Sequence, residues 1–318
     1  MDQNIRTWIK HVGRGKTLAR DLDATQAEQA IGALLDGCFT PAQAGAFLQA
    51  LRIKETTVDE LVGAARALRQ RSTPVTFEAG ARPVVVNLAF DTPRKAGVVS
   101  LLACAYLRRS DLCHPVVVWE PGCLFPQTRS VEQTKDVLRL DPWLAQGECP
   151  MFTVSQLVSG WSGLSRLRAE LGFRTILNTL EKVVRPLLDA PVLVGISHGT
   201  FAHRLPQVLL ERGSVRAASV QGHHGTLDLG LGSEPTSVVV LDKDGAREAS
   251  ISSDGFEEPA ILLKSDFDRW PERIRDRRGP LWKAIARQAA LIHSVACDTS
   301  FQESLQILSS KGIQHGHA

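Results

Sequence analysis

A serine in a Gly-x-Ser-x-Gly pattern is the first feature of this sequence that could do chemistry. Residues 195–199 read Gly-Ile-Ser-His-Gly, between an apolar run and a helical pattern. A hydrolase exposes its nucleophile at such a turn, and Asp228 or Asp242 and then His293 follow Ser197 in Ser–Asp–His order. Serine and glycine are also ordinary at strand-to-helix turns, where the hydroxyl caps the helix. No His-Gly-Gly-Gly segment lies upstream, so the sequence favours the turn and keeps the hydrolase as an alternative.

Two stretches concentrate arginine and lysine. Residues 166–185 hold five basic and two acidic side chains, and residues 269–283 hold six basic and two acidic ones together with Trp270 and Trp282. Arginine interleaved with aromatic rings suits phosphate neutralisation and base stacking. A solvated helix face with tryptophan in the core gives the same pattern, and the residues alone slightly favour it.

The adjacent histidines His223 and His224 do not indicate a metal site. Neighbouring side chains point in different directions, and neither a His-Glu-x-x-His pattern nor a cysteine-rich spacing accompanies them. A pair of loop histidines near a ligand cleft is the favoured interpretation. The sequence assigns no metal ligand.

Composition places the chain among ordinary folded proteins. Its 318 residues are 43% hydrophobic and 22% charged, which excludes disordered, collagen-like and coiled-coil classes. A net charge of +3 does not mark the whole protein as a nucleic-acid binder. No apolar run approaches the ~18 residues of a membrane span, and no secretory signal is visible. We therefore predict a cytoplasmic protein that does not contact membranes, whose six cysteines are free thiols.

The N-terminal part of the chain reads as helices. Thr25, Thr40 and Thr57 each stand where an N-cap is expected, the first and third with glutamate three positions later. Gly37 stands where a helix should end. The pattern predicts a helical domain over residues 1–73, followed by a linker over residues 74–83.

A different pattern follows the linker. Short apolar runs predict strands at residues 84–88, 115–119, 191–196, 217–221 and 237–241. Helical patterns lie between or after them, at residues 96–107, up to 210, and at 281–296. Strands that alternate with helices predict an α/β domain with a mostly parallel sheet over residues 84–318.

Four segments carry a resemblance to known proteins: residues 35–43, 46–56 and 60–64, and residues 168–178, which read R-x-x-L-G-x-R-T-x-x-N. The first three are similar to the helical domain of the anthranilate phosphoribosyltransferase family, glycosyltransferase family 3, and the fourth looks like a segment of the same family. The resemblance implies a nucleoside phosphorylase/phosphoribosyltransferase-like fold along nearly the whole chain. It also implies that the helices of residues 160–186 pack on the helical domain, and that the protein is a homodimer through that domain.

The donor site departs from the family in three places. The resembled enzymes carry G-T-G-G-D-G after the first strand, where glycines let backbone N–H groups approach the diphosphate of phosphoribosyl pyrophosphate. Residues 88–97 hold Arg94 and Lys95 there instead. Their K-H-G-N-R segment matches residues 119–123, where Glu120 would repel a diphosphate. Their magnesium-holding acidic pair falls near residues 225–228, where only Asp228 is acidic. These departures predict a degraded donor site.

Residues 179–186 look like the T-L-x-K-L-L-N-P run of a family branch whose members bind nucleic acid. The first hypothesis is therefore a catalytically impaired homologue that binds single- or double-stranded nucleic acid without sequence preference. The candidate phosphate or ligand contacts are Arg94, Lys95, Arg168, Asn178, Lys182 and Asp228. The candidate nucleic-acid contacts are Arg185, Arg269, Arg273, Arg277 and Arg278.

Two alternatives stay open. In the first, the chain is an active pentosyltransferase of the phosphoribosyltransferase type with an altered donor or acceptor, and only then is magnesium required. Arg94 and Lys95 would bind the donor's phosphates by charge, while Arg168, which matches the family's acceptor-carboxylate arginine, would orient an acidic acceptor. Asn178 and Asp228 would support the reaction. The other alternative is the serine hydrolase that uses Ser197.

Overall fold

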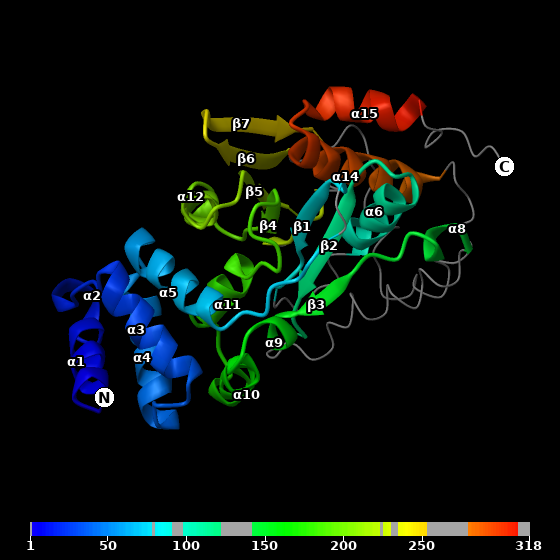
Figure 1. The fold of residues 1–318 in the computed structure, drawn as a ribbon. Helices are drawn as coiled ribbons and strands as arrows, with labels where there is room; N and C mark the ends of the chain where they lie inside the picture. The colour runs from blue at the N-terminus through cyan, green and yellow to red at the C-terminus, as the bar shows by residue number, and fades with distance from the viewer. Residues whose placement is uncertain are drawn as a thin grey trace.

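Five helices form the N-terminal bundle of the computed structural model, which describes residues 2–77, 80–90, 98–121, 142–222, 225–229, 235–252 and 279–310. They are α1 (Asp2–Val12), α2 (Gly15–Leu18), α3 (Ala24–Leu35), α4 (Pro41–Lys54) and α5 (Val58–Gln70) (Figure 1). Thr40 and Thr57 each make a reciprocal capping box with the residue three positions later, which confirms the predicted caps. The predicted cap Thr25 is wrong, because Asp23 makes the box with Gln26 instead.

Close packing of α3 and α5 depends on a residue without a side chain. A Cβ at Gly63 would lie 2.1 Å from the carbonyl oxygen of Ala24, so only glycine allows this approach. Glu60, on the same helix, is buried; its carboxylate accepts from the Leu22 N–H and pairs with the Lys54 ammonium at 2.7 Å. Together these contacts fix α5 against its neighbours.

Seven strands form a single sheet in the order β3-β2-β1-β4-β5-β6-β7. They are β1 (Pro83–Asn87), β2 (His114–Trp119), β3 (Met151–Thr153), β4 (Val192–Gly195), β5 (Arg216–Gln221), β6 (Thr236–Asp242) and β7 (Gly245–Ile251). Pairs among the first five strands are parallel, whereas β6 and β7 are antiparallel. The predicted mostly parallel sheet is confirmed.

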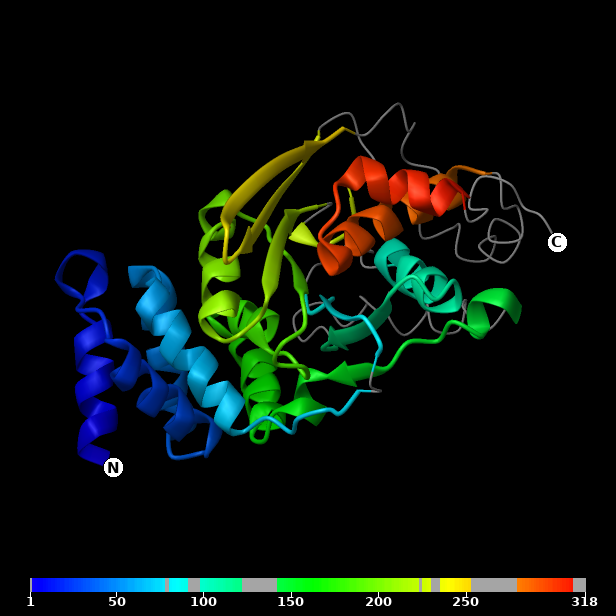
Figure 2. The ribbon, with the colours of Figure 1, turned by 45° about the horizontal axis from the view of Figure 1, so that its top comes forward.

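Helices cover both faces of the sheet (Figures 1 and 2). On one face lie α6 (Val98–Arg109) and α14 (Pro280–Cys297), with α15 (Phe301–Ser310) packed on α14. The remaining helical segments are α8 (Pro142–Ala145), α9 (Val154–Leu157), α10 (Trp161–Leu171), α11 (Leu177–Leu180), η1 (Glu181–Val183), η2 (Gly199–Phe201) and α12 (Arg204–Glu211). Strand residues alternate between the two cores: Val85 packs on the side of the bundle and α12, while Val84 and Val86 pack against α6 and α14.

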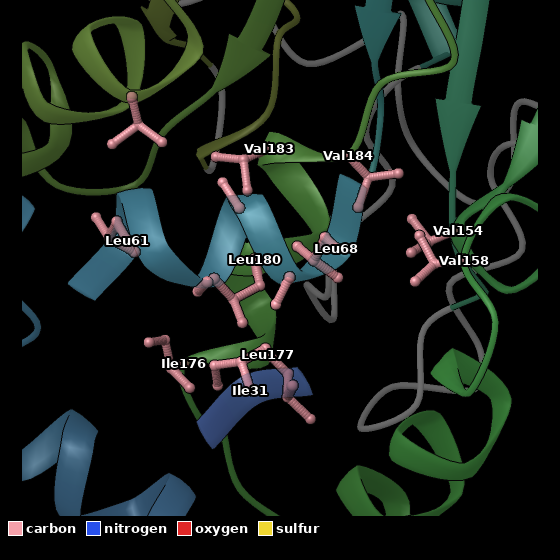
Figure 3. Packing of buried hydrophobic residues seen from close by; sticks show 14 of the residues in the cluster. Ile31, Leu61, Leu68, Val154, Val158, Ile176, Leu177, Leu180, Val183 and Val184 are labelled. Carbon is pink, nitrogen blue, oxygen red and sulfur yellow. The ribbon is translucent and has the colours of Figure 1, made fainter. Parts of the chain in front are cut away.

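The bundle shares its core with residues 161–187. Figure 3 places Leu177 and Leu180 of α11 beside Ile31 of α3 and the leucines of α5, and all of them belong to one buried cluster. The predicted packing of residues 160–186 on the helical domain is confirmed. The connection after α5 is fastened to the same region, because the Thr73 N–H donates to the Leu157 carbonyl and the Val75 N–H to the Pro186 carbonyl. None of the helices in the described parts is long and apolar enough to cross a membrane.

Candidate functional site

A cavity of about 360 Å³ lies where the bundle meets the carboxyl ends of β1 and β4; we call it the main pocket. Phe90 follows β1 and Ser197 follows β4, while Arg52 and Thr56 come from the end of α4 and the turn after it. In open α/β sheets ligands bind outside the carboxyl ends of the strands, where the strand order reverses. Since β1 and β4 flank that reversal, the main pocket is the candidate site.

Four basic side chains line the main pocket. They are Arg52, Arg174, Lys182 and Arg204, and the acidic side chains in the described lining are Glu55 and Glu181. The Arg52 guanidinium donates to the Arg174 carbonyl, and Arg204 Nη1 lies 3.5 Å from the Thr56 carbonyl oxygen. These contacts bring positively charged side chains of the bundle and of the α/β part together. An excess of positive charge in a cleft attracts an anionic ligand.

Lys182 connects the two strand ends beneath the pocket. Its Nζ donates to the Gly195 carbonyl at 2.7 Å and to the Ala89 carbonyl at 3.3 Å. Burial lowers the pKa of Lys182 to about 8; the charge of Arg174 acts in the same direction, and that of Glu181 opposes it. The sequence-predicted Lys182 is therefore a pocket residue, whose charge changes within the mildly alkaline range.

Asn178 offers a donor at the pocket wall. Its Oδ1 accepts from the Thr175 N–H at 3.0 Å, which closes the turn before α11. Its buried Nδ2 has no hydrogen-bond partner among the described residues. An unsatisfied buried N–H₂ group costs free energy, which a ligand acceptor in the pocket would recover.

Arg168 does not line the main pocket. Its Nη1 lies 2.7 Å from Glu181 Oε2, and both side chains are 1% exposed. Arg168 comes from α10 and Glu181 from η1. The predicted acceptor-binding arginine thus already holds a carboxylate that belongs to the chain itself.

Ser197 and His198 both line the main pocket, next to Gly225. Gly225 has φ +79°, and a Cβ there would lie 2.0 Å from Ser197 Oγ. The predicted triad is not assembled. His293 lines a different cavity and contacts Ser304 Oγ at 3.0 Å, while Asp242 pairs with Arg216 and Arg247. His293, the expected base, therefore lies in a different cavity from Ser197, which contradicts the hydrolase alternative. Residues that follow one another in Ser–Asp–His order need not meet in the fold.

Asp228 and Glu120 have structural partners. Asp228 is 1% exposed, and its Oδ1 accepts from the N–H and the hydroxyl of Ser100 in α6 at 2.9 and 2.6 Å. The Glu120 carboxylate accepts from Ser155 and Ser165. Neither lines the main pocket, and no group of three His, Cys, Asp or Glu suited to a metal occurs in the described ranges.

Arg185 is 7% exposed, and its guanidinium donates hydrogen bonds to other parts of the protein rather than facing solvent. It donates to the Leu188 carbonyl at 2.7 Å, to Ser214 Oγ and to the Arg212 carbonyl. Six other basic candidates lie outside the described residues: Arg94, Lys95, Arg269, Arg273, Arg277 and Arg278. His223 and His224 also lie outside them.

Sequence reasoning did not select Arg52, Arg174 or Arg204. Arg52 and Arg174 stand inside the segments that carry the family resemblance, a signal that would have found them. Arg204 lies outside the segments that carry the resemblance. It is the first residue of α12, and only the fold brings it to the main pocket.

Comparisons with known proteins agree with this architecture. Residues 6–72 match the family model described as glycosyl transferase family, helical bundle domain. The anthranilate phosphoribosyltransferase of Methylobacterium sp. (strain 4-46) is 33% identical, over 91% of this chain and 82% of its own length. The Saccharomyces cerevisiae enzyme in complex with PRPP and Mg has a TM-score of 0.73 at 16% identity, covering 98% of this chain and 94% of its own. The Thermus thermophilus enzyme has a TM-score of 0.69 at 20% identity, covering 99% of this chain and 95% of its own.

Proposed function

Because this chain belongs to the anthranilate phosphoribosyltransferase family, we propose that it is a pentosyltransferase with an altered acceptor. The main pocket takes a phosphorylated pentose donor and an acceptor that presents no carboxylate to Arg168. One observation carries this proposal: four basic side chains gather at the carboxyl ends of β1 and β4, in the fold of a phosphoribosyltransferase.

The donor half of the proposal rests on charge. Arg52, Arg174 and Arg204 bear guanidinium groups, which bind phosphate oxygens through paired N–H donors. In the transfer, the bond between the anomeric carbon and the diphosphate oxygen breaks, and a bond from the acceptor atom to that carbon forms. The acceptor's proton passes to solvent. Fixed cations stabilise the negative charge that develops on the leaving diphosphate.

The acceptor half rests on Arg168. In the family this position is matched to the arginine that takes an acidic acceptor, but here Glu181 neutralises it within the protein. An acceptor without a carboxylate needs no free guanidinium at this position.

The test is release of pyrophosphate from phosphoribosyl pyrophosphate in the presence of magnesium. We expect slow release with anthranilate and faster release with neutral aromatic amines. The double variant Arg52→Gln/Arg204→Gln should lower the affinity for the donor at least about tenfold, because each change removes a charge-assisted contact. Arg20→Gln, an exposed position outside the described cavities, makes the same type of charge change elsewhere.

Two results would contradict the proposal. If the donor neither binds nor raises the melting temperature, the main pocket is not a donor site. If anthranilate is the best acceptor, the Arg168–Glu181 pair does not set acceptor choice. Nucleic-acid binding stays a prediction, since most of its basic candidates lie outside the described residues. Homodimerisation through the helical domain also stays a prediction.

A further inference from the structure

The segment that carries Lys182 in the main pocket continues into a second cavity, of about 160 Å³. Three arginines from separate elements line it: Arg69 of α5, Arg185 after η1 and Arg212 at the end of α12. We call it the arginine pocket. Its described lining contains no acidic side chain.

The arginines of this pocket repel one another. Burial, followed by the charges of Arg212 and Arg69, lowers the pKa of Arg185 to about 10. Burial, followed by the charges of Arg69 and the nearby Arg66, lowers the pKa of Arg212 to about 10 as well. Neighbouring positive charges therefore add to burial in disfavouring the protonated forms of Arg185 and Arg212.

The acidic residues nearby do not compensate these charges. Asp189 and Glu28 oppose the shifts of Arg185 and Arg212 but are the weakest influences on them. Glu28 accepts a hydrogen bond from the Gln70 side chain at 2.6 Å. Within the described parts of the chain, none of the four arginines takes part in a salt bridge. Charges left without a counter-ion at a cavity form a site for an external anion.

Hydrogen bonds fix Arg185 in the arginine pocket, whereas Arg69 and Arg212 can be reached from solvent. Arg185 is held by the Leu188 carbonyl, the Ser214 hydroxyl and the Arg212 carbonyl. Arg69 is exposed and Arg212 half-buried, so a ligand can reach both side chains from solvent. The cavity of 160 Å³ is several times larger than the ~30 Å³ that one water molecule occupies in the liquid. It therefore has room for a tetrahedral oxyanion.

We propose that the arginine pocket binds a phosphate group. Guanidinium forks match the geometry of phosphate oxygens and keep their charge in a partly buried place, where an ammonium would lose its proton. The phosphate belongs either to a small phosphorylated molecule or to the backbone of a single-stranded nucleic acid. The site is separate from the main pocket and does not depend on the transferase proposal.

Isothermal titration with inorganic pyrophosphate tests the inference. The background variant Arg52→Gln/Arg204→Gln weakens the main pocket, so that the binding that remains reports on the arginine pocket. Adding Arg69→Gln and Arg212→Gln should reduce that binding at least about tenfold, since two charge-assisted contacts are lost. Arg20→Gln, added to the same background, should leave it unchanged. Neither substituted pocket position is fully buried, and thermal melts monitored by circular dichroism verify that the variants fold.

The outcomes separate the two proposals. If Arg52→Gln/Arg204→Gln alone abolishes pyrophosphate binding, the main pocket stands and the arginine pocket is overturned. If Arg69→Gln/Arg212→Gln alone abolishes it, the arginine pocket stands and the donor site fails. If the fourfold variant binds like its background, the inference is overturned.

A second arm identifies the source of the phosphate. Fluorescence anisotropy of a labelled single-stranded oligonucleotide is measured at several salt concentrations. Loss of affinity and a shallower salt dependence in Arg69→Gln/Arg212→Gln indicate a phosphodiester backbone, because each phosphate contact contributes to the salt slope. An unchanged oligonucleotide affinity with weakened pyrophosphate binding indicates a small phosphorylated ligand.

Discussion

The guanidinium of Arg168 lies 2.7 Å from the carboxylate of Glu181, and both side chains are 1% exposed. Thirteen positions separate the two residues, across the turn after α10 and the short helix α11. Removing one member of such a pair strands a buried charge, whereas replacing both by apolar groups is often tolerated. The pair is therefore a sensitive point of the protein's stability.

Glu181→Gln should lower the free energy of unfolding by about 3–5 kcal/mol. The amide keeps the shape of the side chain but leaves the Arg168 charge unbalanced. Guanidinium chloride unfolding measures the change. The double variant Arg168→Met/Glu181→Leu should lose much less than the sum of the two single variants, and strict additivity would mean that the pair does not interact.

Glu181→Gly should let an external carboxylate reach Arg168. The missing side chain removes the built-in anion, so benzoate should raise the melting temperature of this variant by mass action. Benzamide has the same ring without the charge and should have no effect. Equal stabilisation of the parent protein by benzoate would show that Arg168 is already available.

Lys182 should make stability increase with pH over part of the alkaline range. Its folded pKa is about 8, whereas an unfolded lysine titrates near 10.4. Between these values the unfolded state binds more protons, so the free energy of unfolding rises with pH, by at most roughly 3 kcal/mol. The measurement is urea unfolding of the parent and of Lys182→Met from pH 7 to pH 10.

The informative quantity is the difference in the free energy of unfolding between the parent and Lys182→Met at each pH. Burial raises the pKa of the thiols of Cys104, Cys113 and Cys149, which makes stability fall with pH as unfolded thiols ionise. Both proteins share this loss. Parallel pH profiles for the parent and for Lys182→Met would contradict the assigned role of Lys182.

Phe47→Ala and Leu51→Ala should each destabilise the bundle. Phe47 is 0% exposed and packs its ring 5.4 Å from that of Phe39, and Leu51 is 2% exposed. Cavity formation at such positions costs about 3–5 kcal/mol for phenylalanine and about 2–5 kcal/mol for leucine. Ile53→Ala, on the same helix at 52% exposure, is the control and should change stability by less than about 0.5 kcal/mol.

Local signals in the sequence predicted many elements of the fold. The capping boxes of Thr40 and Thr57 depend on residues three positions apart, and the buried strands are continuous apolar runs, so both are visible in one dimension. Strands β3 and β7 were not predicted. The first has three residues, and the second is an edge strand whose residues are exposed except Ile251.

The site was less predictable because it depends on long-range geometry. Lys182 and Asn178 were selected and line the main pocket, whereas Arg52 and Arg204 meet there from helices that are far apart in the sequence. The Arg168–Glu181 contact depends on how the chain turns between α10 and α11, which no local pattern specifies. Charge alone could not distinguish the buried Arg185 from a solvent-facing arginine.

The core that α11 shares with α3 and α5 also bears on synthesis of the protein. The ribosome synthesises Leu61 and Leu68 long before Leu177 and Leu180, which share one buried cluster with them in the folded protein. Part of the apolar surface of the bundle therefore stays exposed until the chain has grown past residue 187. Contacts of such large sequence separation slow folding and expose apolar surface meanwhile.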